Sequence, residues 1–414
     1  MNPDFLEKYD CTLTVKTPVF VGSGKRLSKI EYIYEPGNGP GTGTLRVIDL
    51  RKLYEYMASK GKEMALEEYF SKPGNYDMRA FLHNNQIWRD EYEKFAYTLG
   101  NFSLPGDSAR QQPSSRSTWT GQRWNSAQSQ KPRRQGKIKT YEILEFMSDP
   151  YGNPYVPGST IKGMLRTALA ASRIVHDADL KKNIASLLSS SDGKNNNYLA
   201  NEIALAETKI FNNLGYDCQK QSNAVNSEMR LIKVSDSEPL SSENLMICQK
   251  FDERTDGTGN PLPIFKICLK PGTQIKFSVT LEKSGYGTPS RKQLCSFDDI
   301  VRSLRDFDKL YVNKFLNQFK EQVEPTDEVR CWLGSAGFHS KTILTAVYDK
   351  ENDLFKKTKD IFRNTINSKN DTFKENKYDC DGKECSVYPN MRKKANEAGA
   401  DFGETVLTFS KKAI

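Results

Sequence analysis

The residue types between Tyr155 and Arg173, YVPGSTIKGMLRTALAASR, are suited to binding a phosphate group. Gly158, Gly163, Lys162 and Arg166 crowd the opening of an otherwise regular helix. A helix N-terminus with free N–H groups attracts anions, and neighbouring cations add to that attraction. Gly163 costs about 1 kcal/mol relative to alanine inside a helix, which indicates a close approach of another group. The alternative is a capped amphipathic helix with solvated cations, and spacing alone does not separate the two.

The residues around these glycines predict where the helix begins. Pro157 pushes the residue before it into an extended conformation, so the helix starts after it. Ser159 or Thr160 is suited to cap the N-terminus. Apolar or small residues then recur at the spacing of one buried face, at positions 161, 164, 165, 168, 169 and 172. This pattern predicts a helix that buries one face and presents its cations on the other.

Acid–base catalysis is the competing chemistry, and histidine is its commonest group. The chain has 3 histidines. His83 and His176 stand near the ends of expected helices, where we expect structural or exposed roles. His339 precedes Lys341 in LGSAGFHSKTIL and is the histidine best placed to meet a polyanion. It could be a phosphate contact, a stacking group or a catalyst.

Two further patterns suggest enzymatic sites but are incomplete. VGSGKR superficially resembles the phosphate-binding loop of nucleotide hydrolases. Val19 stands where that loop needs its first glycine, and Arg26 follows Lys25 where it needs serine or threonine. Asp236 in VSDSEP and Asp256 in RTDGTGN could belong to a metal-dependent site, but we expect both to serve in turns. We predict no catalytic residue.

The cysteines do not form a metal-binding pattern. Only Cys380 and Cys385, in CDGKEC, lie close together, and no second pair or histidine completes a zinc site. We expect all 8 cysteines to be reduced thiols in a cytoplasmic protein. We predict neither a metal nor a cofactor.

Composition favours a polyanionic partner and excludes a membrane helix. The chain has 414 residues, a net charge of +9 and 37% hydrophobic residues, and no run approaches the roughly 18 apolar residues of a membrane span. The first residues, MNPDFLEKYDCTLTVK, do not resemble a secretory signal. We therefore predict a cytoplasmic location and no membrane partner.

Strand-like and helix-like patterns are interleaved along the whole chain. Period-two alternation predicts a strand over 11–22, two further strand-like runs span 29–36 and 43–50, and helix-like patterns predict helices over 50–72, 78–98 and 297–321. Such interleaving is typical of the α+β class. We divide the chain into a unit over 1–200 and a unit over 201–414.

A compositional change at Asn101 marks an insertion. Residues 101–139 are rich in Ser, Gln, Pro and Arg, with Asp107 as the single acid, so they cannot bury enough apolar surface to order the chain. We predict a disordered basic segment. It is either a solvated insertion without a role or a flap whose Trp119 and Trp124 stack on bases.

Four stretches in order carry a resemblance to a known family. PGSTIKGMLRTAL is similar to the proline-glycine-serine-x-isoleucine-lysine-glycine motif of the RAMP (repeat-associated mysterious protein) superfamily of CRISPR effector subunits. TPVFVGSGKRLSKIEYIY, then KVSDSEPL with CLKPGTQIKFSVTL, then LGSAGFHSKTIL resemble the fifth Csm subunits of type III-A complexes. The insertion and the residues after Lys350 match less well.

The resemblance implies a fold and a function. The fold would be two ferredoxin-like (RNA-recognition-motif type) units with insertions. The protein would be a non-catalytic RNA-binding subunit that caps the 3′ end of the guide RNA and helps guide maturation and assembly in antiviral defence. The alternative is a metal-independent endoribonuclease that processes guide RNA.

The same resemblance implies partners and contact residues. The partners would be the guide (CRISPR) RNA and a neighbouring Csm backbone subunit, with the small Csm subunit and host trimming nucleases as further candidates. Three segments would meet RNA: a first glycine segment (residues 22–26), a helix motif (residues 157–169) and a late glycine loop (residues 334–342). The implied RNA-binding residues are Gly22, Gly24, Lys25, Arg26, Gly158, Ser159, Lys162, Arg166, Gly334, Gly337, His339 and Lys341.

Overall fold

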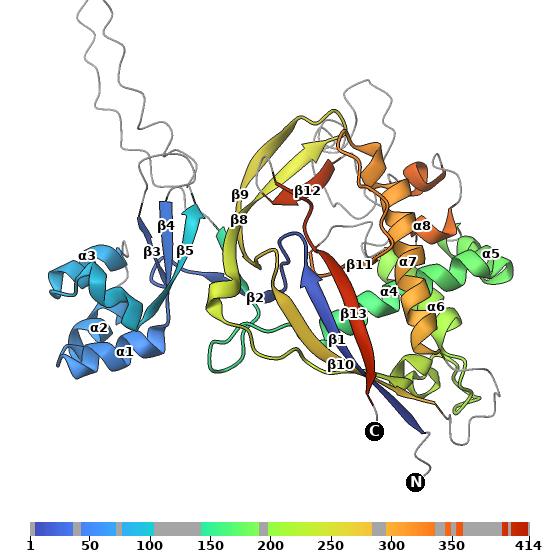
Figure 1. Ribbon diagram of the computed structural model, residues 1–414, viewed down its shortest axis with the longest axis horizontal. Helices are drawn as coiled ribbons and strands as arrows, with labels where there is room; N and C mark the ends of the chain where they lie inside the picture. The colour runs from blue at the N-terminus through green and yellow to red at the C-terminus, as the bar shows by residue number, and fades with distance from the viewer. Residues whose placement is uncertain are drawn as a thin grey trace, which may run out of the picture.

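The computed structural model confirms the predicted α+β class (Figure 1). It describes residues 5–35, 43–71, 77–102, 142–189, 198–283, 295–335, 344–348, 353–358, 391–395 and 399–412. No helix in these ranges is long and apolar enough to cross a membrane. The cysteines of these ranges are free thiols: Cys11, Cys218, Cys248, Cys268, Cys295 and Cys331.

The first sheet has five antiparallel strands with one face buried. Along β1, Cys11, Leu13 and Val15 point into the core while Asp10 and the threonines between them point away, as the period-two pattern predicts. The strand order is β11 (Val329–Trp332), β13 (Glu404–Lys412), β1 (Leu6–Val15), β10 (Gln274–Glu282) and β7 (Ile232–Val234).

Helices α4 and α7 cover the buried face of this sheet (Figure 1). Leu165 of α4 and Ile300 of α7 meet Cys11 and Val279 around one small internal void. In α7, Ser296 and Asp299 form a capping box at the N-terminus. The helices of this body are α4 (Gly158–His176), α5 (Ala178–Ser189), α6 (Tyr198–Phe211), α7 (Phe297–Lys314) and α8 (Leu344–Val347).

The second sheet contains a long hairpin, β8–β9, that is extended on both sides. Only the pairing of β6 with β9 is parallel; the other strand pairs are antiparallel. The strand order is β12 (Met391–Ala395), β8 (Leu245–Arg254), β9 (Gly259–Leu269), β6 (Glu142–Phe146) and β2 (Gly22–Leu27).

Strand pairing does not follow the predicted boundary near residue 200. In the first sheet β1 lies between β13 and β10, and in the second sheet β6 and β2 continue from β9. Each five-stranded sheet therefore combines strands from both predicted units. A chain-order division cannot reveal this, because hydrogen bonding joins strands that are more than 250 residues apart.

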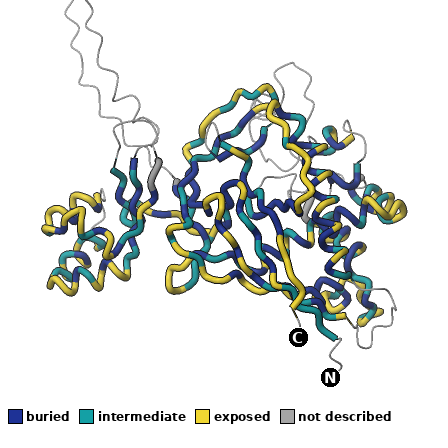
Figure 2. The backbone as a smooth tube through the Cα atoms, in the orientation of Figure 1, coloured by how far each residue is buried: buried dark blue, intermediate teal, exposed yellow. Residues whose placement is uncertain are grey.

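A smaller unit with its own core stands beside this body (Figures 1 and 2). Its apolar residues, including Leu53, Met57 and Leu82, form a cluster separate from the main core. Its sheet is β3 (Tyr32–Glu35), β4 (Gly43–Ile48) and β5 (Ala96–Phe102), and its helices are α1 (Leu50–Ser59), α2 (Glu63–Ser71) and α3 (Met78–Asn84).

The predicted helix over 78–98 is wrong in its second half. Helix α3 ends near Asn85, Gln86 adopts a positive φ of 57°, and a 3₁₀ helix spans Arg89–Lys94. The chain then enters β5, which contains Asn101 and Phe102. Pairing with β4 overrides the local helical spacing. The rest of the predicted basic insertion, from residue 103, lies outside the described residues.

Candidate nucleic-acid interface

Helix α4 begins at Gly158, and its cap comes from a distant part of the chain. The prediction that Ser159 or Thr160 is the N-cap is wrong, because Pro157 occupies that position and makes no side-chain capping bond. Instead the Gly158 N–H donates to the Asp236 carboxylate at 2.7 Å. A carboxylate satisfies the free N–H and complements the positive end of the helix dipole. Asp236 is therefore a capping residue.

Packing within the protein explains Gly158. A Cβ at this position would lie 2.5 Å from the Val234 carbonyl oxygen and 2.7 Å from backbone atoms of Ser235. The same segment holds the residues before the helix, since Val156 and Ser237 exchange two hydrogen bonds of 2.9 Å. Gly158 is thus needed for the close approach of the chain after β7.

Gly163 has no such explanation in the described part of the chain. It is exposed, and a Cβ there would have no heavy atom within 4 Å. Lys162 is half-buried beside it and makes no ion pair or hydrogen bond with a described residue. Burial and the nearby Arg166 both lower the pKa of the Lys162 ammonium. This pair is therefore a position where an external anion could approach the helix closely.

The arginines of the helix motif and its continuation are engaged inside the protein. Arg166 pairs with Glu207 of α6 and lies over the ring of Phe211 at 5.8 Å. Arg173 pairs with Glu228, and burial lowers the pKa of its guanidinium. These contacts pack α4 against α6 and the segment that follows it. Of the predicted phosphate contacts on this helix, Arg166 already has an acidic partner.

The first glycine segment forms strand β2, where the sequence predicts a loop. Gly22 pairs with Phe146 and Arg26 with Leu144, so the strand bulges between them. Gly24 adopts a φ of +85°, which glycine tolerates without a steric penalty. Gly22, Gly24, Lys25 and Arg26 are exposed. The bulge turns this basic segment outward from the sheet edge.

The late glycine loop starts against the residues just before β2. Gly334 has a φ of +72°, and a Cβ there would lie 2.2 Å from the Phe20 carbonyl oxygen. That oxygen accepts a hydrogen bond of 3.1 Å from the Ser335 N–H. The predicted contacts Gly337, His339 and Lys341 lie outside the described residues.

Backbone hydrogen bonds connect the three predicted segments. The Val21 carbonyl accepts from Met147 at 2.8 Å, and the Met147 carbonyl accepts from Tyr155 at 3.2 Å, just before the helix motif. Phe20, next to Val21, holds Ser335 at the start of the late loop. These bonds therefore bring together the residues that flank the first glycine segment, the residues that precede the helix motif, and the start of the late glycine loop.

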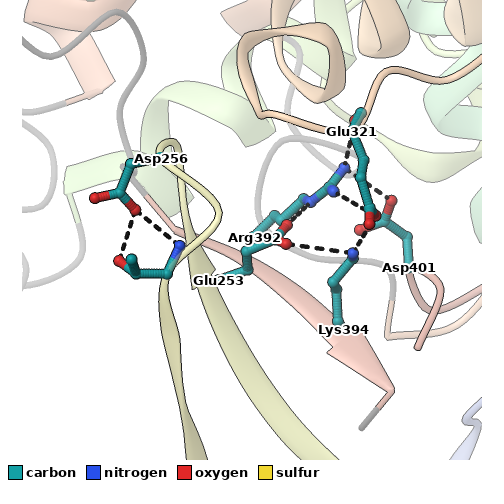
Figure 3. Close-up of polar contacts among 7 residues, drawn as sticks. Glu253, Asp256, Glu321, Arg392, Lys394 and Asp401 are labelled. Carbon is teal, nitrogen blue, oxygen red and sulfur yellow. Dashed lines mark hydrogen bonds and ion pairs between the residues drawn. The ribbon is translucent and has the colours of Figure 1, made fainter. Parts of the chain in front are cut away.

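The catalytic alternatives have ordinary contacts. His83 meets Trp88 edge-on at 5.0 Å between ring centroids, and His176 lies 3.0 Å from Asp306. The Asp256 carboxylate accepts two hydrogen bonds from Thr258 in the turn between β8 and β9 (Figure 3). The described residues hold no group of three metal-ligating side chains. Of the candidates, His339 lies outside the described residues.

One polar cluster was missed in the sequence. Arg392 and Lys394 of β12 point toward Glu253 of β8, with Glu321 and Asp401 completing the cluster (Figure 3). Arg392 and Lys394 are both 3% exposed. Burial raises the pKa of the Asp401 carboxyl to about 6. Pairing of β12 with β8 places the basic segment MRKKA beside these carboxylates.

Comparison with known proteins defines the class. Residues 12–358 match the family described as the RAMP superfamily, and the chain belongs to it. The fold agrees with a chain in a solved structure of a "Csm-crRNA-target RNA ternary complex in type III-A CRISPR-Cas system", with a TM-score of 0.57 and 15% identity. That match covers 97% of this chain and 100% of the other.

Within the superfamily, the chain is similar to Csm5. It is 28% identical over 283 residues to "CRISPR system Cms protein Csm5" of Mycobacterium tuberculosis, which covers 68% of each chain. It is 22% identical over 343 residues to the protein of the same name from Streptococcus thermophilus, which covers 81% of this chain and 80% of the relative. The resemblance stated from the four motifs is confirmed.

Proposed function

We propose that this chain is the non-catalytic Csm5 subunit of a type III-A CRISPR complex and binds the 3′ part of the guide RNA. The observation that carries the proposal is the meeting of three basic or glycine-bearing segments, held together by Phe20, Val21, Met147 and Tyr155. The likeness to a chain of a Csm–crRNA–target RNA complex supports the ligand class.

The proposed contacts are to RNA phosphates and not to bases. Lys162 and the exposed backbone at Gly163 bind on the helix side, and Lys25 and Arg26 on the β2 bulge bind beside it. Gly334 and Ser335, at the start of the late loop, lie against Phe20 just before this bulge. Contacts of this kind position a strand without reading its sequence, which suits a protein whose guides differ in sequence.

The remaining parts of the proposal concern assembly. The subunit caps the guide at its 3′ end, contacts a neighbouring Csm backbone subunit and helps guide maturation by positioning RNA for host trimming nucleases; the small Csm subunit is a further partner. The two five-stranded sheets belong to two ferredoxin-like units that exchange strands across residue 200. This arrangement is supported by the strand order, because each of these sheets contains strands from both halves of the chain.

Binding of single-stranded RNA at two salt concentrations tests the proposal. Lys162→Ala should weaken binding to all sequences alike and reduce the salt slope by about 0.7, the value for one phosphate on a single strand. Lys182→Ala, an exposed lysine on α5 outside all three segments, is the matched control. Equal affinity of wild type and Lys162→Ala would contradict the helix contact.

Incubation with and without magnesium tests the non-catalytic assignment. Intact RNA under both conditions is expected. Specific fragments that disappear in His339→Ala would instead support the endoribonuclease. Reconstitution of the complex with and without this chain, followed by measurement of guide length, tests the role in maturation.

A further inference from the structure

Lys266 is a buried cation at the base of the late glycine loop. It lies on β9, is 5% exposed, and its Nζ is 4.9 Å from the Phe20 ring centroid and 4.8 Å from that of Phe402. Nζ donates a hydrogen bond of 2.9 Å to Ser335 Oγ. In the part of the chain that the structure describes, no carboxylate pairs with it within 4.0 Å.

The charges around Lys266 do not supply a counter-ion. Cys268 lies on the same strand, Lys250 and Asp252 come from β8, and Lys393 comes from β12. Asp252 is already paired with Lys250, at 3.1 Å. Burial, opposed by Cys268 and reinforced by the neighbouring lysines, lowers the pKa of Lys266 to about 8. A buried charge without a partner is costly, so its presence calls for an explanation.

Ser335 connects this cation to the surface. Its backbone N–H donates a hydrogen bond to the Phe20 carbonyl oxygen, and its hydroxyl oxygen accepts a hydrogen bond from the Lys266 ammonium. Within the part of the chain that the structure describes, no group accepts the hydroxyl proton, and the partly exposed Ser335 stands at the start of the late loop. A hydroxyl that accepts from an ammonium group is polarised and becomes a stronger donor to an anion.

We propose that Ser335 donates its hydroxyl proton to a phosphate oxygen of bound RNA, and that Lys266 is the positioning residue that supplies positive charge through it. The proposal rests on RNA binding as the function. Phe20 fixes both partners, because its carbonyl holds the Ser335 backbone and its ring packs on the Lys266 ammonium. The bound phosphate is the missing counter-ion.

RNA affinity and thermal stability of Ser335→Ala and Lys266→Met test this site, with Lys182→Ala on α5 as the surface-charge control. Both site variants should bind a single-stranded RNA about tenfold more weakly at pH 7, a loss of the size expected for a charge-assisted hydrogen bond. Lys182→Ala should stay within twofold of wild type. Lys266→Met should also reduce the salt slope by about 0.7.

The pH profile separates positioning by charge from a purely structural role. Wild-type affinity should fall between pH 7 and pH 9 as Lys266 loses its proton, and Lys266→Met should lack that part of the fall. Wild-type binding with both site variants within twofold would overturn the inference while leaving the proposed function intact. A wild-type protein that binds no RNA would overturn the proposed function itself. If Lys266→Met unfolds, Ser335→Ala and the wild-type pH profile decide.

Discussion

The buried cations of the second sheet differ in whether carboxylates balance their charge. Arg392 and Lys394 on β12 are surrounded by three carboxylates, from Glu253, Glu321 and Asp401. Lys266 on β9, buried to a similar degree, has a hydroxyl and two aromatic rings. The balanced group holds β12 onto β8, whereas the unbalanced one leaves attraction available for an external anion. We therefore propose that charge balance, and not burial, distinguishes the scaffold from the RNA contact on this sheet.

Helix α4 contains the same contrast in its glycines. Gly158 is required by the backbone at Val234 and Ser235, and Gly163 faces open space. A residue whose type the protein's own packing explains belongs to the scaffold. A residue that costs stability without an internal reason is a candidate for contact with a ligand.

The largest effect is expected from Arg392→Met, which breaks the balanced group. Glu253, 5% exposed, would keep its charge and lose its closest cation. Removal of one partner from a buried ion pair typically costs about 3–5 kcal/mol. Urea unfolding should reveal that loss, while RNA affinity of the folded fraction stays near wild type. A stable variant with weakened RNA binding would reverse the comparison.

The two glycines of α4 should respond to alanine in opposite directions. Gly158→Ala forces a Cβ into the backbone after β7 and should cost about 1–3 kcal/mol. Gly163→Ala should stabilise the protein by about 0.5–1 kcal/mol, because alanine is the better helix former. Thermal unfolding of the two variants measures both. Weaker RNA binding by the more stable Gly163→Ala would sharpen the contrast; equal destabilisation would remove it.

Lys266 should make the stability of the free protein depend on pH. The pKa of its ammonium is lowered from its usual 10.5 to about 8, so between these pH values the unfolded chain binds a proton that the folded chain has released. Stability should therefore rise with pH above pH 8. Lys266→Met should lack this rise. Denaturant titrations at pH 7, 8 and 9 measure the free energy of unfolding of wild type and Lys266→Met. The same pH dependence in both proteins would count against a buried, unpaired ammonium.

The smallest effect is expected from Asp401→Asn. The Asp401 pKa is raised from 3.8 to about 6, so the folded chain holds a proton that the unfolded chain has lost between these values. Its contribution to stability is present at low pH and disappears as pH rises through 6. Unfolding at pH 4.5 and pH 7 should reveal a decrease in wild type that the variant lacks. The same decrease in Asp401→Asn as in wild type would show that another group takes up the proton.

Local patterns in the sequence predicted a large part of the fold. Alternation predicted β1, and helical spacing predicted α1, α4 and α7. The helix predicted over 297–321 ends earlier in the structure, at Lys314. These patterns are readable because side chains alternate across a strand and recur every three to four residues along a helix. The motifs between residues 11 and 345 also indicated the superfamily, which the match over residues 12–358 confirms.

The site was predicted only as separate segments. The sequence pointed to Lys162 and Gly163 through their cost to the helix, but it gave no reason to expect Asp236 at the helix N-terminus. The glycines of residues 22–26 also led to the prediction of a loop, whereas these residues form a bulged strand. Both features depend on partners more than 70 residues away in the chain.

The sequence by itself determined the class of elements, the positive charge and the glycine-bearing motifs, since these follow from residue type and spacing. Only the tertiary structure decided which cations are neutralised. Arg166, Arg173 and Arg392 find carboxylates across the fold, whereas Lys266 finds Ser335. The reason is physical. The electrostatic energy of a buried charge depends on the groups within a few ångströms of it, and the long-range pairing of strands determines which groups those are.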